Sequence, residues 1–172
     1  KEPQVIFSLR ITALNVWEIL VRPVRPFEEP RYQELMQAHH YLGSLPKISE
    51  TLRYVAVWHD QWVALLSFSA SALKCAVRDR WIGWDFRHQY DRLKLIVNNS
   101  RFLILPSFHV PNLASRVMKL SLQRLSEDWR ERYGHQVLVA YSAREARAVL
   151  QTARPAMVVL DVMMESLTAG FE

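Results

Sequence analysis

Two arginines and a short run of amides have the clearest potential for binding chemistry in this sequence. Asn98, Asn99, Ser100 and Arg101 stand together before an apolar run, and Arg53 lies within an earlier apolar segment. Amide, hydroxyl and guanidinium groups contact phosphate oxygens and base edges in proteins that bind nucleic acids. The alternative is structural, because Asn and Ser also cap turns. We predict Arg53 and Arg101 as anion contacts, with Asn98 and Asn99 as further candidates.

Asn112 and Ser115 are two more candidate contacts, because they stand where the longest helix should begin. Asn112 is a good N-cap residue, since its side chain can accept a hydrogen bond from an unpaired backbone N–H. A helix N-terminus also attracts anions through its free N–H groups and its dipole. Both residues are therefore predicted as anion or nucleic-acid contacts.

The remaining polar and aromatic residues show no spacing that marks a site. His39 and His40 are adjacent, so on a helix their side chains point about 100° apart and make a poor ligand pair. Trp81 and Trp84 could stack on bases, although such residues are more often part of a core. Four carboxylates could bind a metal but lack a recognisable spacing: Asp79, Asp85, Asp91 and Asp128. We predict no metal site, and no catalytic residue can be assigned.

The elements that must position these residues alternate between helix and strand. Residues 27–40 have helical periodicity, with two glutamates in the first turn, where the helix dipole favours anions. Residues 52–58 and 62–68 predict a hairpin, in which continuous apolar runs indicate strands covered on both faces. Asn98, Asn99 and Ser100 form a polar break before a short strand at residues 102–105.

The second half of the chain predicts a long helix followed by a strand, a helix and a strand. Residues 112–132 form the long helix, which Gly134 ends. Its predicted buried stripe comprises Ala114, Met118, Leu122, Leu125 and Trp129. Strands at 136–140 and 157–160 flank a helix at 143–153. The fold class is α/β (α+β), a mixed sheet with flanking helices.

Several blocks follow one another in an order and spacing that match a known family. They are residues 39–43 (His-His-Tyr-Leu-Gly), 52–55 (Leu-Arg-Tyr-Val), 79–84 (Asp-Arg-Trp-Ile-Gly-Trp), 98–106 (Asn-Asn-Ser-Arg-Phe-Leu-Ile-Leu-Pro), 112–115 (Asn-Leu-Ala-Ser) and 128–129 (Asp-Trp). Over residues 22–134 the chain resembles the DruA family, named from Druantia anti-phage systems and also found with transposases. The resemblance implies association with nucleic acid and with other defence or transposase proteins. It implies no particular reaction.

The order of elements also resembles acyltransferases of the GNAT fold. In that family a hairpin and an apolar strand precede a helix whose N-terminus faces a pyrophosphate. GNAT enzymes usually have a glycine-rich turn there, whereas this chain has residues 110–116 (Val-Pro-Asn-Leu-Ala-Ser-Arg). Acyl transfer is kept as an alternative function.

The last 39 residues resemble part of a different domain. Residues 136–146 and 154–164, the latter ending in Val-Val-Leu-Asp-Val-Met-Met, resemble the second and third strands of a response-regulator receiver. The resemblance implies that Asp161 is a phosphoacceptor, with Mg²⁺ as cofactor and a histidine kinase as partner. The receiver's acidic pair and later Ser/Thr and Lys have no counterpart here, so we expect Asp161 not to be phosphorylated efficiently. Residues 1–134 are thus expected to be an incomplete DruA-like domain, and residues 135–172 a receiver-like fragment.

Composition places few limits on function. The chain of 172 residues has a formal net charge of +5 and scattered Lys and Arg, which is compatible with an acidic partner or with a solvated basic surface. Cys75 is the single cysteine, so no internal disulfide can form and a cytoplasmic protein is expected. No apolar run reaches 18 residues, so no membrane span is predicted. We expect no cofactor unless the receiver-like segment is functional.

Overall fold

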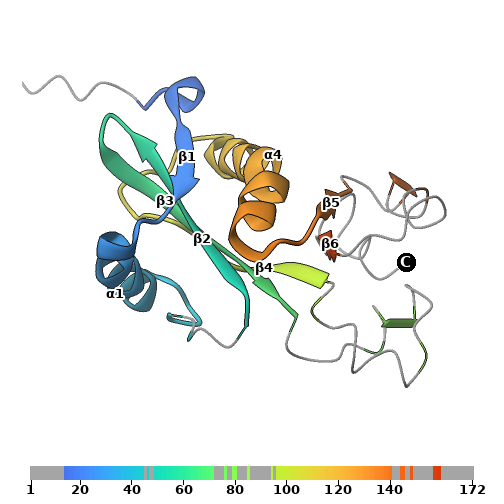
Figure 1. Ribbon diagram of the computed structural model, residues 1–172. Coiled ribbons are helices and arrows are strands. Elements are labelled where there is room, and N and C mark those ends of the chain that lie inside the picture. The colour runs from blue at the N-terminus through green and yellow to red at the C-terminus, as the bar shows by residue number, and fades with distance from the viewer. Residues whose placement is uncertain are drawn as a thin grey trace, which may run out of the picture.

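A six-stranded sheet organises the part of the chain that the structure describes. The computed structural model describes residues 14–44, 46, 49–71, 76, 79–80, 85, 94, 96–140, 144–145, 148 and 157–159. The strand order is β1-β2-β3-β4-β6-β5, in which β1 to β4 are antiparallel and β6 is parallel to both β4 and β5. Helices α1 and α4 flank the sheet (Figure 1). The predicted α/β class, a mixed sheet with flanking helices, is confirmed.

The predicted hairpin is present, and it forms the centre of the sheet. Strand β2 (Thr51–Trp58) pairs with β3 (Gln61–Ala70), and β3 is buried along all but its first residue. The connecting residues His59 and Asp60 both have positive φ, at 44° and 64°. A two-residue loop with this backbone matches the twist of the paired strands. Strand β1 (Leu20–Pro23) extends the sheet along the outer edge of β2.

Two apolar clusters lie on opposite faces of the sheet. Helix α1 (Glu29–His39), which follows the 3-10 turn η2 (Pro26–Glu28), buries Tyr32 and Met36 against Val55, Leu65 and Leu103. Helix α4 (Leu113–Tyr133) covers the other face and buries Trp129 completely. The two faces of each central strand therefore meet different helices, which explains the continuous apolar runs.

Strand β4 (Ile96–Ile104) is longer than the sequence suggested. Asn98, Asn99 and Ser100, predicted as a polar break, are part of the strand. The register steps from Ser67↔Arg101 to Phe68↔Asn99, so Ser100 is the extra residue of a β-bulge. The polar run therefore does not interrupt the sheet, because the bulge accommodates it within the ladder.

Helix α4 corrects two further predictions. Its buried stripe is shifted at the N-terminal end, and comprises Leu113, Val117, Ser121, Leu125 and Trp129. Sequence analysis did not identify this stripe because it includes a polar residue, Ser121. The Ser121 hydroxyl donates a hydrogen bond to the Val117 carbonyl at 2.8 Å. Asn112 occupies the N-cap position but has φ 63° and makes no side-chain capping bond. Gly134 ends the helix with φ 75°, as predicted.

Two short strands complete the sheet after α4. Strand β5 (Val137–Val139) and strand β6 (Met157–Val159) lie parallel, with β6 between β4 and β5. The Ser126 hydroxyl of α4 donates to the Val137 carbonyl at 2.6 Å, which fixes β5 against the helix. Residues 135–159 therefore contribute strands to the same sheet as β1–β4. The division of the chain at Gly134 into segments of different family stays a prediction.

Candidate anion-binding site

The two predicted arginines lie in one row across three strands. Arg53 of β2 pairs with Ser67 of β3, and Ser67 pairs in turn with Arg101 of β4. Side chains of directly paired residues lie on the same face of a sheet, and neighbouring strands are about 4.8 Å apart. The Arg53 and Arg101 backbones are therefore about 10 Å apart, with Ser67 between them.

Tyr32 marks where helix α1 meets this row. Its ring packs in the apolar cluster below α1, and its hydroxyl is 2.8 Å from the Ser67 hydroxyl. Burial raises the pKa of the Tyr32 hydroxyl, while the nearby charges of Arg53 and Arg101 act to lower it. Tyr32 therefore stays neutral, and both guanidinium groups influence the same point on the sheet.

A network of hydroxyl groups, buried except for the half-buried Ser100, continues from this row, and sequence analysis did not identify it. The Thr51 hydroxyl donates to the Ser69 hydroxyl at 3.0 Å, and Ser69 is 2.9 Å from the Ser100 hydroxyl. The Ser100 hydroxyl donates to the Ser67 carbonyl at 3.2 Å. Two serines two positions apart near the end of β3 were the available signal, because Ser67 and Ser69 share a face.

The two guanidinium groups are held by different partners. Arg53 forms an ion pair with Glu29 of α1 at 2.7 Å, and its side chain is only 10% exposed. Arg101 donates from Nε to the Gly43 carbonyl at 3.0 Å and from Nη1 to the Ser100 carbonyl at 2.7 Å. Among the described residues no carboxylate pairs with Arg101, whereas the charge of Arg53 is shared with Glu29.

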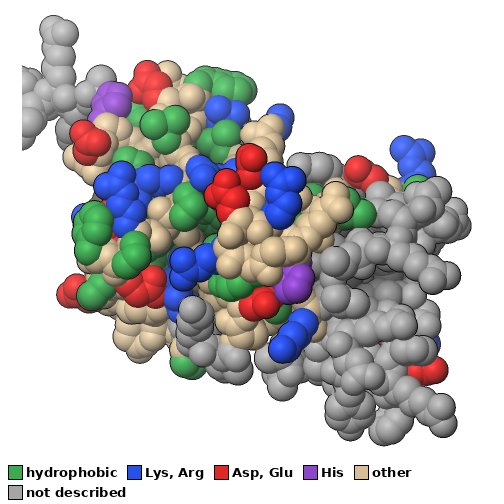
Figure 2. Space-filling model, viewed as in Figure 1, with side chains coloured by type: hydrophobic (Ala, Val, Ile, Leu, Met, Phe, Trp, Pro, Cys, Tyr) green, Lys and Arg blue, Asp and Glu red, His purple; other side chains and the backbone are tan. Residues whose placement is uncertain are grey.

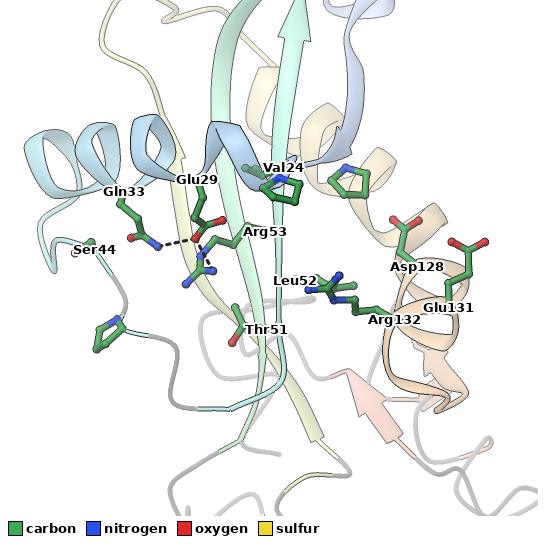
Figure 3. Close-up of a pocket in the computed structure, with 13 residues that line it drawn as sticks. Val24, Glu29, Gln33, Ser44, Thr51, Leu52, Arg53, Asp128, Glu131 and Arg132 are labelled. Carbon is green, nitrogen blue, oxygen red and sulfur yellow. Dashed lines mark hydrogen bonds and ion pairs between the residues drawn. The ribbon is translucent and has the colours of Figure 1, made fainter.

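Arg53 also lines a surface cavity of about 890 Å³ at the edge of β2. Figure 3 shows Glu29 and Gln33 of α1 on one side, Arg53 and Leu52 of β2 in the middle, and residues of α4 on the other side. The complete lining is Pro23, Val24, Pro26, Glu29, Gln33, Ser44, Pro46, Thr51, Leu52, Arg53, Asp128, Glu131 and Arg132. A ligand in this cavity would reach Arg53 from solvent.

The α4 wall of the cavity has its own charge network. Asp128 accepts hydrogen bonds from the Tyr54 hydroxyl at 2.8 Å and from Arg124 at 2.6 Å and 3.0 Å. Arg124 also donates to the Val21 carbonyl at 2.6 Å, which ties α4 to β1. Burial raises the pKa of the Tyr54 hydroxyl, and its bond to Asp128 raises it further. Asp128 is thus a structural acceptor in this network.

The other predicted contacts do not join Arg53 and Arg101. Asn98 of β4 is half-buried and pairs with Ser69 of β3, two residues beyond Ser67 on that strand. Asn99 pairs with Phe68 of the cluster below α4, and its buried Nδ2 has no acceptor among the described residues. Asn112 and Ser115 are exposed at the start of α4. The structure therefore brings two of the six predicted contacts into one row.

Several other predicted features lie outside the described residues, including Trp81, Trp84, Asp91 and Asp161. Within the described ranges, no group of three or more His, Cys, Asp or Glu side chains is placed to hold a metal ion. His40 lies near Arg101, and burial together with that charge lowers the pKa of its imidazole. No helix in the described part of the chain combines the length and apolarity needed to cross a membrane.

Comparison with models of protein families shows to which family the chain belongs. The model of the family described as Druantia protein DruA matches residues 12–157. The chain belongs to the DruA family. The match includes both the Arg53 and the Arg101 motifs, and it continues past Gly134 through β5 to the start of β6. No comparison supports a receiver segment or phosphorelay, and the DruA match ends before Asp161.

Comparison with solved structures gives distant likenesses, of which one is an acetyltransferase. A GNAT family acetyltransferase from Brucella melitensis, solved in complex with acetyl-CoA, aligns with 69% of this chain and 82% of its own. The aligned residues are 15% identical and the TM-score is 0.42. A likeness of this degree supports no statement about activity. Comparison with curated proteins gives no match.

Proposed function

We propose that this DruA-family chain acts in an anti-phage defence or transposase-associated system by binding nucleic acid through its phosphate backbone. The family description, Druantia protein DruA, supports the first part. The cross-strand row of Arg53, Ser67 and Arg101 supports the second. Other proteins of such a system are proposed partners.

The row suits phosphate because of the geometry of its donors. A guanidinium group offers a planar set of N–H donors that matches two phosphate oxygens, and it remains charged at all physiological pH values. The backbones that carry the two groups stand about 10 Å apart on the same sheet. Arg53 faces a cavity that a backbone phosphate can enter, where the phosphate would compete with Glu29. The contact would position nucleic acid without reading its sequence.

The distribution of surface charge agrees with nucleic acid binding at a few arginines rather than over a large basic surface. Figure 2 shows Lys and Arg side chains interspersed with Asp and Glu side chains on the face in view. A chain with a net charge of +5 attracts nucleic acid at low salt, and localised arginines then determine where it binds. The proposal therefore predicts binding that weakens strongly with salt.

Fluorescence anisotropy with labelled DNA at several salt concentrations tests the proposal. We expect affinity to fall as salt rises, and Arg53→Gln or Arg101→Gln to weaken binding and lower the slope of log K against log salt by about 1 each. Arg130→Gln is the matched control, since Arg130 is exposed on α4 and lies 3.7 Å from Glu127. Circular dichroism confirms that each variant is folded. Undetectable binding at low salt, or equal effects of all three variants, contradicts the proposal.

A further inference from the structure

Two exposed aromatic side chains stand at the ends of edge strand β1. Trp17, in the 3-10 turn η1 (Val16–Glu18), is 73% exposed, and Phe27, in η2, is 75% exposed. Leu20, the first residue of β1, is 72% exposed between them. Large apolar side chains at this exposure, close together in the chain, commonly mark an interaction surface. We call Trp17, Leu20, Phe27 and their associated arginines the β1 edge surface.

An arginine side chain lies over each of the two aromatic rings, Trp17 and Phe27. The Arg116 guanidinium carbon lies 5.1 Å from the Trp17 ring centroid, and that of Arg25 lies 5.9 Å from the Phe27 centroid. Within the described part of the chain, no carboxylate forms an ion pair with Arg116, and its buried Nε has no acceptor. The β1 edge surface therefore combines stacking platforms with positive charge.

We propose that single-stranded nucleic acid binds along the β1 edge surface, stacking bases on Trp17 and Phe27 and placing phosphates against Arg116 and Arg25. Aromatic platforms combined with cations are the general means by which proteins bind single strands without sequence preference. The proposal rests on the proposed function and specifies the form of nucleic acid. Trp17 and Phe27 are ten steps apart along the chain, which limits the distance between their backbones to about 33 Å.

The β1 edge surface adjoins the cavity that Arg53 lines. Pro23, Val24 and Pro26, which directly follow or end β1, line the cavity that Arg53 also lines. A strand bound along β1 would therefore reach this cavity at its Phe27 end. Figure 1 shows β1 at the border of the sheet, with α1 beyond its C-terminal end.

The acidic residues of this region are already engaged. The Glu18 carboxylate accepts a hydrogen bond from Trp58 Nε1 at 3.0 Å and lies 3.0 Å from His59. Glu28 binds Arg22 through both carboxylate oxygens at 2.6 Å. The Glu28 charge is thus compensated by Arg22, and the Glu18 carboxylate is held by hydrogen-bond donors, so the repulsion that Glu28 offers to phosphate is reduced.

A second copy of this chain is the competing occupant, because β1 is an edge strand. Strand β1 has only four residues and ends at Pro23, which lacks an N–H donor. Short edge strands that contain proline and charged residues are typical of edges that resist pairing with another chain. The arginine-stacked aromatics, by contrast, complement bases and phosphates. These observations favour nucleic acid.

Binding of the full chain to labelled oligo(dT) of about 12 nucleotides, within the range of single-strand site sizes, tests the inference. A duplex of equal length serves as comparison. We expect tighter binding to the single strand, a loss of roughly 5- to 100-fold for Trp17→Ala or Phe27→Ala, and partial retention for Trp17→Phe. Arg116→Gln should lower the salt dependence. Tyr41→Ala is the matched control, because Tyr41 is an aromatic residue that is 88% exposed and follows the end of α1 rather than flanking β1.

The outcomes separate this inference from the proposed function. If DNA binding depends on Arg53 and Arg101 but Trp17→Ala and Phe27→Ala bind oligo(dT) like the parent chain, the inference is overturned and the proposed function stands. If neither single-stranded nor duplex DNA binds, the proposed function fails first. If sedimentation shows a dimer that Trp17→Ala disrupts while oligo(dT) affinity is unchanged, the surface belongs to a second copy, and the inference is overturned.

Discussion

The Tyr133 hydroxyl satisfies both backbone groups of Thr51. It accepts a hydrogen bond from the Thr51 N–H and donates one to the Thr51 carbonyl oxygen, each at 2.9 Å. Strand β1 pairs with β2 only from Tyr54 to Val57, so this edge position has no strand partner in β1. The side chain of α4 thus takes the place of a neighbouring strand, and it fixes the end of the helix against the β2 edge.

Removing this hydroxyl should destabilise the fold. In Tyr133→Phe the ring packing on Trp129 is kept, but the Thr51 N–H and carbonyl lose their partner. Unpaired, partly buried backbone groups of this kind cost about 1–3 kcal/mol of unfolding free energy. Urea denaturation measures the difference. Tyr41→Phe is the control, since Tyr41 is exposed. Equal stability of the two variants contradicts the role assigned to Tyr133.

The pairing of Glu28 with Arg22 should make stability depend on acid pH. The hydrogen bonds from Arg22 lower the pKa of Glu28 from 4.5 to about 2. Because the folded pKa lies below the unfolded value, the ion pair stabilises the fold above pH 4.5, and this contribution is lost as pH falls towards 2. Because the pair is partly exposed to solvent, its contribution is limited to about 1 kcal/mol.

Unfolding free energies of the parent chain and Glu28→Gln, measured across this pH range, check that prediction. The parent chain should be more stable above pH 4.5, and the two should converge near pH 2. A constant difference over the whole range would show that the carboxylate charge is not the source of the effect.

The hairpin that brings Arg53 near Ser67 could be foreseen from the sequence, but the exact partners of Arg53 and Arg101 could not. The two-residue turn after Trp58 pairs Trp58 with Gln61, and that register alone would place Arg53 opposite Leu66. A register shift between Ala56 and Val57 moves the partner of Arg53 to Ser67. Strand β4 follows β3 after residues 71–95, so no local turn sets its register. A shift of one residue moves every side chain to the other face, and the Ser100 bulge produces such a shift between Arg101 and Asn99.

The errors in α4 have the same kind of cause. Its buried stripe includes Ser121, whose hydroxyl bonds to its own helix, so a polar residue occupies a core position. Sequence analysis therefore assigned the stripe to Met118 and Leu122, which are half-buried. The hydroxyl network was missed because serines in an apolar strand carry no sign of which distant strand will supply their partners. Such pairings depend on tertiary contacts alone.

Substitutions at Asn112 can distinguish two roles for this residue. One is the predicted side-chain N-cap, and the other is the left-handed backbone conformation that the structure shows. A side-chain cap would tolerate Asn112→Ser, since Ser caps helices about as well as Asn. The observed φ of 63° instead predicts a loss of about 1 kcal/mol for Ser and no loss, or a gain, for Asn112→Gly. Thermal denaturation of the two variants distinguishes the cases. A stable Ser variant would restore the capping role.

Glu29 should restrain nucleic-acid binding at Arg53, because its carboxylate occupies the guanidinium group that a phosphate would use. Glu29→Gln removes that competitor, and we expect DNA affinity to rise three- to tenfold, about 0.7–1.4 kcal/mol. Glu34→Gln provides the control, since it removes the same charge from an exposed position of α1. Any general effect of net charge appears equally in both variants. Fluorescence anisotropy at low salt measures the difference, and an Arg53→Gln background should abolish it. If Glu29→Gln binds no more tightly than Glu34→Gln, phosphate does not displace this carboxylate, and Arg53 acts in folding rather than in binding.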